Sequence, residues 1–133
     1  MWNIMIHKNT LKIIMIEIRS YKPTDETPVV RLWIDCGLVV PWNNPYRDIQ
    51  RKLEVQPELF LAACLDGQVI GTVMAGYDGH RGWINYLAVH PNHQGAGIGK
   101  RIMDEAESLL RASGCPKINL QVRRTNINVI RVL

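Results

Sequence analysis

Short apolar runs and helically spaced apolar residues divide the chain into strands and helices. Residues 16–19 alternate apolar and polar side chains, which predicts a first strand. Two apolar runs, 59–65 and 68–75, flank Asp66-Gly67, a pair that favours the type I′ turn of an antiparallel hairpin. A further run, Trp83–Val89, predicts a fourth strand.

Three segments place apolar residues at the spacing of a helix. The first begins within Pro23–Glu26, with acidic residues in its first turn, and stops at Gly37. The second begins with Asn44 as N-cap and Pro45 at its first position. The third runs from Ile98 to Ser113. The predicted buried faces are Val29, Leu32, Trp33 and Cys36; Tyr46, Ile49 and Leu53; and Ile98, Ile102, Met103, Ala106, Leu109 and Leu110.

Alternation returns near the end of the chain, where Ile118, Leu120 and Val122 predict a fifth strand. With 133 residues, of which 47% are hydrophobic, the chain suits one globular α/β domain with a core of its own. We expect residues 1–14, whose apolar run polar residues interrupt, to be an upstream extension and not a signal peptide or a membrane span. The domain is then 15–133.

The most informative segment is Gln94-Gly95-Ala96-Gly97-Ile98-Gly99, between the fourth strand and the third helix. No Ser, Thr, Asp or Asn stands there to cap the free amides of the helix. Those amides and the positive end of the helix dipole suit a phosphate or pyrophosphate. A Walker A loop would need Ser or Thr at Arg101, and a dinucleotide GxGxxG would need Gly at Lys100, so neither motif fits.

The pattern Gln-x-x-Gly-x-Gly after Val89-His90-Pro91 resembles the acetyl-CoA motif of the GCN5-related N-acetyltransferase (GNAT) family. The resemblance extends from Met15 to about Ile130. It implies the acyl-CoA N-acyltransferase fold, a mixed and mostly antiparallel sheet flanked by helices. It also implies an enzyme that transfers an acetyl group from acetyl-CoA, its co-substrate, to an amine of a small molecule or protein.

In that family the pantetheine arm lies along the central strand and the pyrophosphate lies on the glycine loop. The resemblance therefore implies coenzyme contacts from both segments and from one residue near the end of the chain. The residues implied are Leu87, Ala88, Val89, Gln94, Gly95, Ala96, Gly97, Ile98, Gly99, Lys100 and Asn126.

Acyl transfer to an amine also needs a group that removes a proton from the ammonium and a proton for the departing thiolate. The family often uses a Glu on or near the central strand, but residues 83–89 contain no carboxylate. The nearest titratable groups are Asp78 and His80, which we name as candidate catalytic residues and which equally suit a turn. The segment where the family commonly shapes its acceptor site holds Trp42, Asn43 and Asp48, for which packing, turn and helix-start roles are equally good readings.

The end of the chain departs from the family pattern. Asn126–Arg131 follows the family's closing motif, but Val132 and Leu133 stand where Phe and Tyr are expected. The resemblance implies that the tyrosine that commonly protonates the coenzyme A thiolate is missing, together with the last helix and strands. We therefore expect a C-terminally truncated domain, which a single inserted base in the gene would explain. Two alternatives remain open: a non-catalytic remnant that binds coenzyme A weakly, and a phosphate-binding regulatory module.

The charge and the cysteines indicate which classes of ligand and partner to expect. The net charge is +4 and the pI is near 9.2, but Lys and Arg are scattered, so an anionic small ligand explains them as well as a nucleic acid would. Three cysteines without CxxC spacing indicate a reducing cytoplasm and no disulfide framework. His90 and His93 lack a third ligand nearby, so we expect no metal. We expect no nucleic acid and no membrane among the partners.

Overall fold

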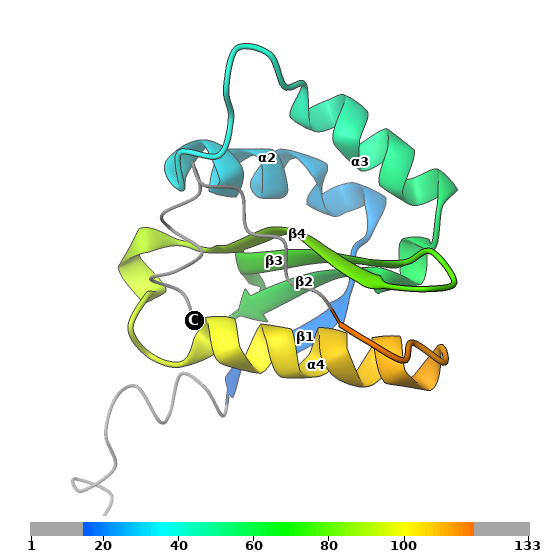
Figure 1. Ribbon diagram of the computed structural model, residues 1–133. Coiled ribbons are helices and arrows are strands. Elements are labelled where there is room, and N and C mark those ends of the chain that lie inside the picture. Colours follow the sequence, from blue (N-terminus) through cyan, green and yellow to red (C-terminus); the bar gives the residue numbers. More distant parts are fainter. Residues whose placement is uncertain (1–14, 119–133) are drawn as a thin grey trace, which may run out of the picture.

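The computed structural model describes residues 15–118, which form one sheet layered between helices (Figure 1). Helices α2 (Glu26–Asp35) and α3 (Pro45–Glu54) cover one face of the sheet, and α4 (Ile98–Ala112) covers the other. Within this part of the chain, no helix combines the length and the apolar character that crossing a membrane requires.

The sheet has four strands in the order β1-β2-β3-β4, and each neighbouring pair is antiparallel. The strands are β1 (Glu17–Ser20), β2 (Phe60–Leu65), β3 (Gln68–Tyr77) and β4 (Gly82–Val89). The predicted hairpin is confirmed, because Leu65 pairs with Gln68 and the two turn residues, Asp66 and Gly67, have φ of 51° and 78°. A type I′ turn requires positive φ at both of these positions.

One residue of the predicted fifth strand lies within the described part of the chain. Ile118 forms an isolated parallel bridge with Gly82 at the start of β4, which makes the sheet mixed at this edge. A Cβ at Gly82 would lie 3.0 Å from the Cys115 sulfur, so a side chain there would crowd the bridge. Leu120 and Val122 lie outside the described residues.

Helix α2 follows a short 3-10 turn, η2 (Pro23–Asp25), in which Asp25 accepts two hydrogen bonds from the Arg19 guanidinium at 2.7 and 2.9 Å. This pairing is the main reason that the pKa of Asp25 lies below its usual value. The predicted inner face of α2 is confirmed, since all four of its residues are buried. They are Val29, Leu32, Trp33 and Cys36.

Helix α3 begins as predicted but buries a different face. Asn44 accepts hydrogen bonds from the N–H groups of Tyr46 and Arg47 at 3.1 and 3.3 Å, so it is the N-cap. Of the three residues predicted to be buried, only Ile49 is, at 1% exposed; Tyr46 and Leu53 are 51% and 40% exposed, and for them the prediction was wrong.

The inner face of α3 is polar because it meets backbone groups of β3 that β2 does not reach. Lys52 donates a hydrogen bond to the C=O of Ala75, and partial burial lowers the pKa of Lys52. Gln56, just after α3, donates to the C=O of Tyr77 at 2.9 Å and accepts from its N–H at 2.8 Å. Polar side chains of α3 therefore replace the missing strand partner at this end of β3.

Helix α4 packs its predicted face on the opposite side of the sheet. Five of the six residues of that face are buried: Ile98, Ile102, Met103, Ala106 and Leu110. Leu109 is partly buried against the same core. Cys36, Cys64 and Cys115 are buried and form no disulfide within the described residues.

Candidate functional site

The glycine segment joins β4 to α4 through the short turn η4 (Pro91–His93). Gly95 and Gly97 both have φ of 82°, a conformation that strains residues with a Cβ. Gly97 is the N-cap of α4, and no side chain caps it. The N–H of Arg101 donates to the C=O of Gly97 at 3.2 Å, so the amides at 98–100 precede the first turn's hydrogen bonds. The loop thus presents backbone donors to an anion.

The remaining loop residues hold this geometry in place. Ala96 and Ile98 are 7% and 1% exposed and pack into the core beneath α4, and Gly99 is also buried. Lys100 is exposed, with its ammonium 3.9 Å from a carboxylate oxygen of Asp104. With Ala96 and Ile98 buried, the loop has its backbone N–H groups and the Lys100 side chain as possible donors to a ligand. Asn126, also predicted to contact the coenzyme, lies outside the described residues.

Gln94 ties the loop to the end of β4. Its side-chain amide donates a hydrogen bond to the C=O of Val89 at 2.9 Å, and the thiol of Cys36 donates to the same oxygen at 3.3 Å. Burial raises the pKa of Cys36 to about 11, so its thiol stays protonated and can remain a donor at neutral pH. The side chain of Gln94 thus has a structural role in addition to its place in the glycine motif.

The hydrogen bonds between β3 and β4 determine which backbone groups of β4 face away from β3. His90 donates its N–H to the C=O of Ile70 on β3 at 2.8 Å, and antiparallel pairs alternate between bonded and unbonded. Val89, the next residue back, therefore directs both of its backbone groups away from β3. Ala88 pairs with Thr72, so the N–H of Ala88 faces β3 and the C=O of Leu87 faces away. Of the three predicted pantetheine contacts, Leu87 and Val89 have outward groups and Ala88 does not.

A bulge at Tyr86 and Leu87 interrupts β4. Thr72 pairs with Ala88 but Met74 pairs with Asn85, so β4 contains one extra residue at this point. Tyr86 lies in the bulge with φ of 50°, an uncommon conformation for a bulky residue. Its hydroxyl donates a hydrogen bond to Asp48 on α3. The hydrogen bond therefore brings an acidic side chain of α3 to the middle of β4.

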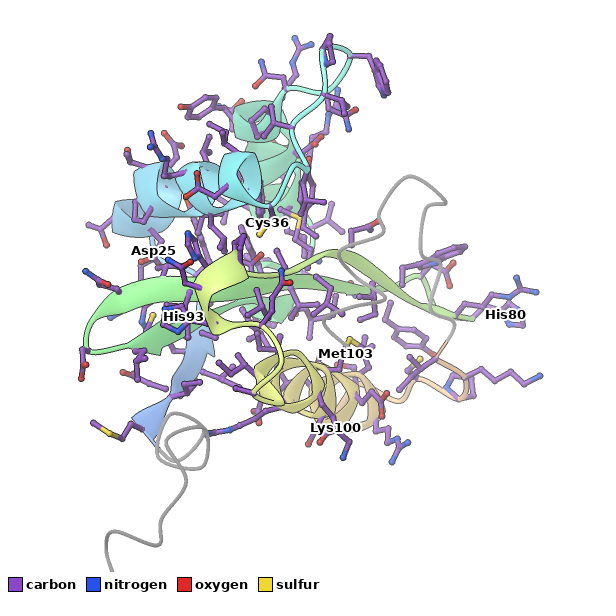
Figure 2. The ribbon with its side chains drawn as sticks, turned by 90° about the vertical axis from the view of Figure 1, so that its left-hand side faces the viewer. Asp25, Cys36, His80, His93, Lys100 and Met103 are labelled. Carbon is purple, nitrogen blue, oxygen red and sulfur yellow. The ribbon has the colours of Figure 1, made fainter. Side chains whose placement is uncertain are left out.

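Asp78 and His80 lie at the opposite end of β4. Figure 2 shows His80 at the tip of the molecule, far from Lys100 and His93. At about 3.3 Å per residue along a strand, Gly82 at the start of β4 is already roughly 13 Å from the bulge at Tyr86, and His80 lies in the loop before Gly82. The structure therefore brings neither candidate base to the glycine loop.

Asp78 is bound into its own turn. Its carboxylate accepts hydrogen bonds from the N–H groups of Arg81 and His80 at 2.7 and 2.8 Å, and from the Trp83 indole at 2.9 Å. These bonds, led by the one from Arg81, lower the pKa of Asp78 to about 2. A carboxylate with so low a pKa is a weak base at neutral pH.

A cleft of about 550 Å³ lies beside α2 and the β2–β3 turn. Each of three basic side chains in its lining lies against a carboxylate: Arg19 against Asp25, Arg31 against Asp35, and His90 against Asp35. These pairs leave this cleft less suited to an anion than the start of α4. Residues 15–118 contain no group of three or more His, Cys, Asp or Glu side chains that could hold a metal ion.

Sequence analysis did not single out Tyr86 or Thr72. Tyr86 looked like an ordinary strand residue, and the sequence gives no sign of its positive φ. Thr72, the one hydroxyl within the apolar run 68–75, was a signal that could have been read as a buried hydrogen-bonding position.

Comparison with known proteins identifies the family of the chain. The family model described as Acetyltransferase (GNAT) family matches residues 23–133. The chain belongs to the GNAT family. An acetyltransferase of Sodalis glossinidius is 50% identical over 115 residues, which cover 86% of this chain and 81% of that protein. The chain is thus an acetyl-CoA-dependent acetyltransferase of this family.

Solved structures show the same fold. Ard1 from Thermoplasma volcanium is 25% identical, with a TM-score of 0.75 over 88% of this chain and 78% of Ard1. A GNAT acetyltransferase from Brucella melitensis, solved in complex with acetyl-CoA, is 25% identical, with a TM-score of 0.64 over 81% of this chain and 76% of its own. The predicted GNAT fold is confirmed.

Proposed function

We propose that this GNAT enzyme transfers the acetyl group of acetyl-CoA to an aliphatic amine. The amine nitrogen, once deprotonated, attacks the thioester carbon, the C–S bond breaks, and coenzyme A leaves as its thiolate. The pyrophosphate binds the amides at the start of α4, the pantetheine lies along the outward edge of β4, and the acceptor binds on the α3 side of the bulge.

One observation carries the coenzyme part of the proposal. The uncapped start of α4 at Gly97 and the outward N–H of Val89 belong to segments that Gln94 ties together through a 2.9 Å hydrogen bond. A pyrophosphate suits the first because backbone donors and the helix dipole act on the same anion. An amide-containing pantetheine arm suits the second, because it can pair with backbone groups of β4 that face away from β3.

Asp48 supports the acceptor part of the proposal. It contacts the bulge through the hydroxyl of Tyr86, and its side chain is 27% exposed. Its other oxygen lies 3.9 Å from the guanidinium of Arg51, a side chain that is itself 70% exposed. An aliphatic amine is an ammonium ion at neutral pH, and a partly buried carboxylate attracts it. An aromatic amine is neutral at that pH and gains much less from the same carboxylate. Trp42, 76% exposed in the turn that precedes α3, offers an apolar surface nearby along the chain.

An Asp48→Asn variant tests the acceptor site. The amide oxygen still accepts the Tyr86 hydrogen bond, but the charge that attracts the ammonium is gone. We expect the KM for an aliphatic amine to rise about tenfold or more, in line with the loss of a charge-assisted hydrogen bond. The measurement is coenzyme A release from acetyl-CoA with a panel of aliphatic and aromatic amines.

Glu54→Gln is the matched control, because it removes the same charge from the exposed end of the same helix. We expect its KM values to stay within about twofold of the unsubstituted enzyme. An Asp48→Asn enzyme that keeps its KM for aliphatic amines, or a chain that prefers aromatic amines, would place the acceptor elsewhere.

A further inference from the structure

Tyr86 holds a conformation that its own side chain disfavours. A φ of 50° at a bulky residue has an energetic cost, and such a residue persists only when its surroundings fix it. Leu87 and Val89, whose outward groups form the proposed pantetheine edge, follow within three residues. Whatever fixes Tyr86 therefore also sets the direction of that edge.

Two buried side chains fix Tyr86. The hydroxyl of Thr72 donates a hydrogen bond to the C=O of Tyr86 at 2.9 Å and accepts one from the indole N–H of Trp33, also at 2.9 Å. Thr72 and Trp33 are both 0% exposed. The Trp33 ring also stacks on the Tyr86 ring, with a centroid distance of 3.8 Å and an interplanar angle of 19°. Tyr86 is thus held at its backbone and at its ring.

We propose that Thr72 is a positioning residue for acetyl-CoA. By holding the C=O of Tyr86, its hydroxyl keeps the bulge in the conformation that points the C=O of Leu87 and the N–H of Val89 at the pantetheine arm. This inference rests on the coenzyme site proposed above. Thr72 acts through Tyr86 and the strand, and it touches neither substrate.

The chemistry of the site explains why a hydroxyl is required. The Thr72 oxygen donates one hydrogen bond and accepts another, and Ser can do the same in the same place. Val matches the shape of Thr but can do neither, so it frees the Tyr86 carbonyl and leaves the Trp33 N–H buried without its partner. The two substitutions therefore separate the hydrogen bonds of Thr72 from its shape.

The test compares Thr72→Val with Thr72→Ser. We expect Thr72→Val to raise the KM for acetyl-CoA about tenfold, while the KM for the amine changes less, because the released carbonyl lets the pantetheine edge turn. Thr72→Ser should keep the KM for acetyl-CoA within about threefold. Both are assayed at a temperature where circular dichroism shows them folded, and Thr72→Ala replaces Thr72→Val if the latter does not fold.

Leu59→Ala controls for a general loss of stability. It opens a cavity in the core at a residue that is 2% exposed and belongs to a different apolar cluster from Trp33 and Tyr86. We expect it to lower the melting temperature and leave the KM for acetyl-CoA unchanged. A Thr72→Val enzyme that likewise melts earlier with an unchanged KM would overturn the inference. Failure of the coenzyme site itself would look different, because then the unsubstituted chain would bind no acetyl-CoA.

Discussion

A Gly97→Glu variant is expected to lose about a hundredfold or more of its affinity for acetyl-CoA. The added side chain and negative charge would stand at the N-cap of α4, where the proposed pyrophosphate approaches the backbone. A hundredfold change in affinity corresponds to about 2.7 kcal/mol. We expect repulsion between like charges and the loss of one or two backbone contacts to exceed this value together. Isothermal titration with acetyl-CoA measures the affinity directly.

Gly114→Glu is the control for the strain that the substitution brings. Gly114 follows the other end of the same helix with φ of 89°, so a glutamate there meets the same backbone penalty and adds the same charge. Nothing lies within 4 Å of a Cβ built at Gly114. We expect this variant to bind acetyl-CoA as the unsubstituted protein does. Equal affinities for all three proteins would reject the phosphate site at α4.

A Trp33→Ala variant is expected to lose about 3 to 5 kcal/mol of unfolding free energy, as is usual when a large aromatic side chain is removed from a core. Trp33 is fully buried, stacks on Tyr86 and Phe60, and donates a hydrogen bond to Thr72. Small domains have about 5 to 15 kcal/mol in total, so the variant should be near the limit of folding. Urea unfolding followed by circular dichroism gives the value.

Trp42→Ala separates burial from residue type. Trp42 lies nine positions later in the chain and is 76% exposed. Its removal should change the unfolding free energy by about 0.5 kcal/mol or less. Similar losses for the two tryptophans would contradict the packing of α2 on the sheet.

The parts of the fold that local chemistry decides could be read from the sequence. Asp66-Gly67 sets the hairpin turn, Asn44 caps α3, and the glycines at 95 and 97 adopt the positive φ that they alone tolerate well. The inner face of α3 could not be read in this way. It depends on β3 extending past the end of β2, which leaves backbone groups for Lys52 and Gln56 to bind.

The candidate site also has one part that the local sequence predicts and one part that it does not. The glycine loop is contiguous in the chain, so its local pattern is enough to predict an anion site. The contacts of Tyr86 with Asp48 and Trp33 join residues 38 and 53 positions apart, and no local pattern specifies them. Asp78 and His80 are candidate bases by sequence because they precede β4, but an extended strand carries its first residues away from its last.

The most direct measurement of the coenzyme site is a titration of ¹⁵N-labelled protein with acetyl-CoA, followed by the amide resonances of the backbone. The account predicts that the largest shifts fall on residues 95–100 and on Val89, with smaller shifts at Tyr86 and Leu87. ADP, which carries a pyrophosphate but no pantetheine, should shift residues 95–100 and leave Val89 in place. Shifts concentrated instead around the cleft at Arg19, Asp35 and His90, with residues 95–100 unmoved at saturating acetyl-CoA, would contradict it.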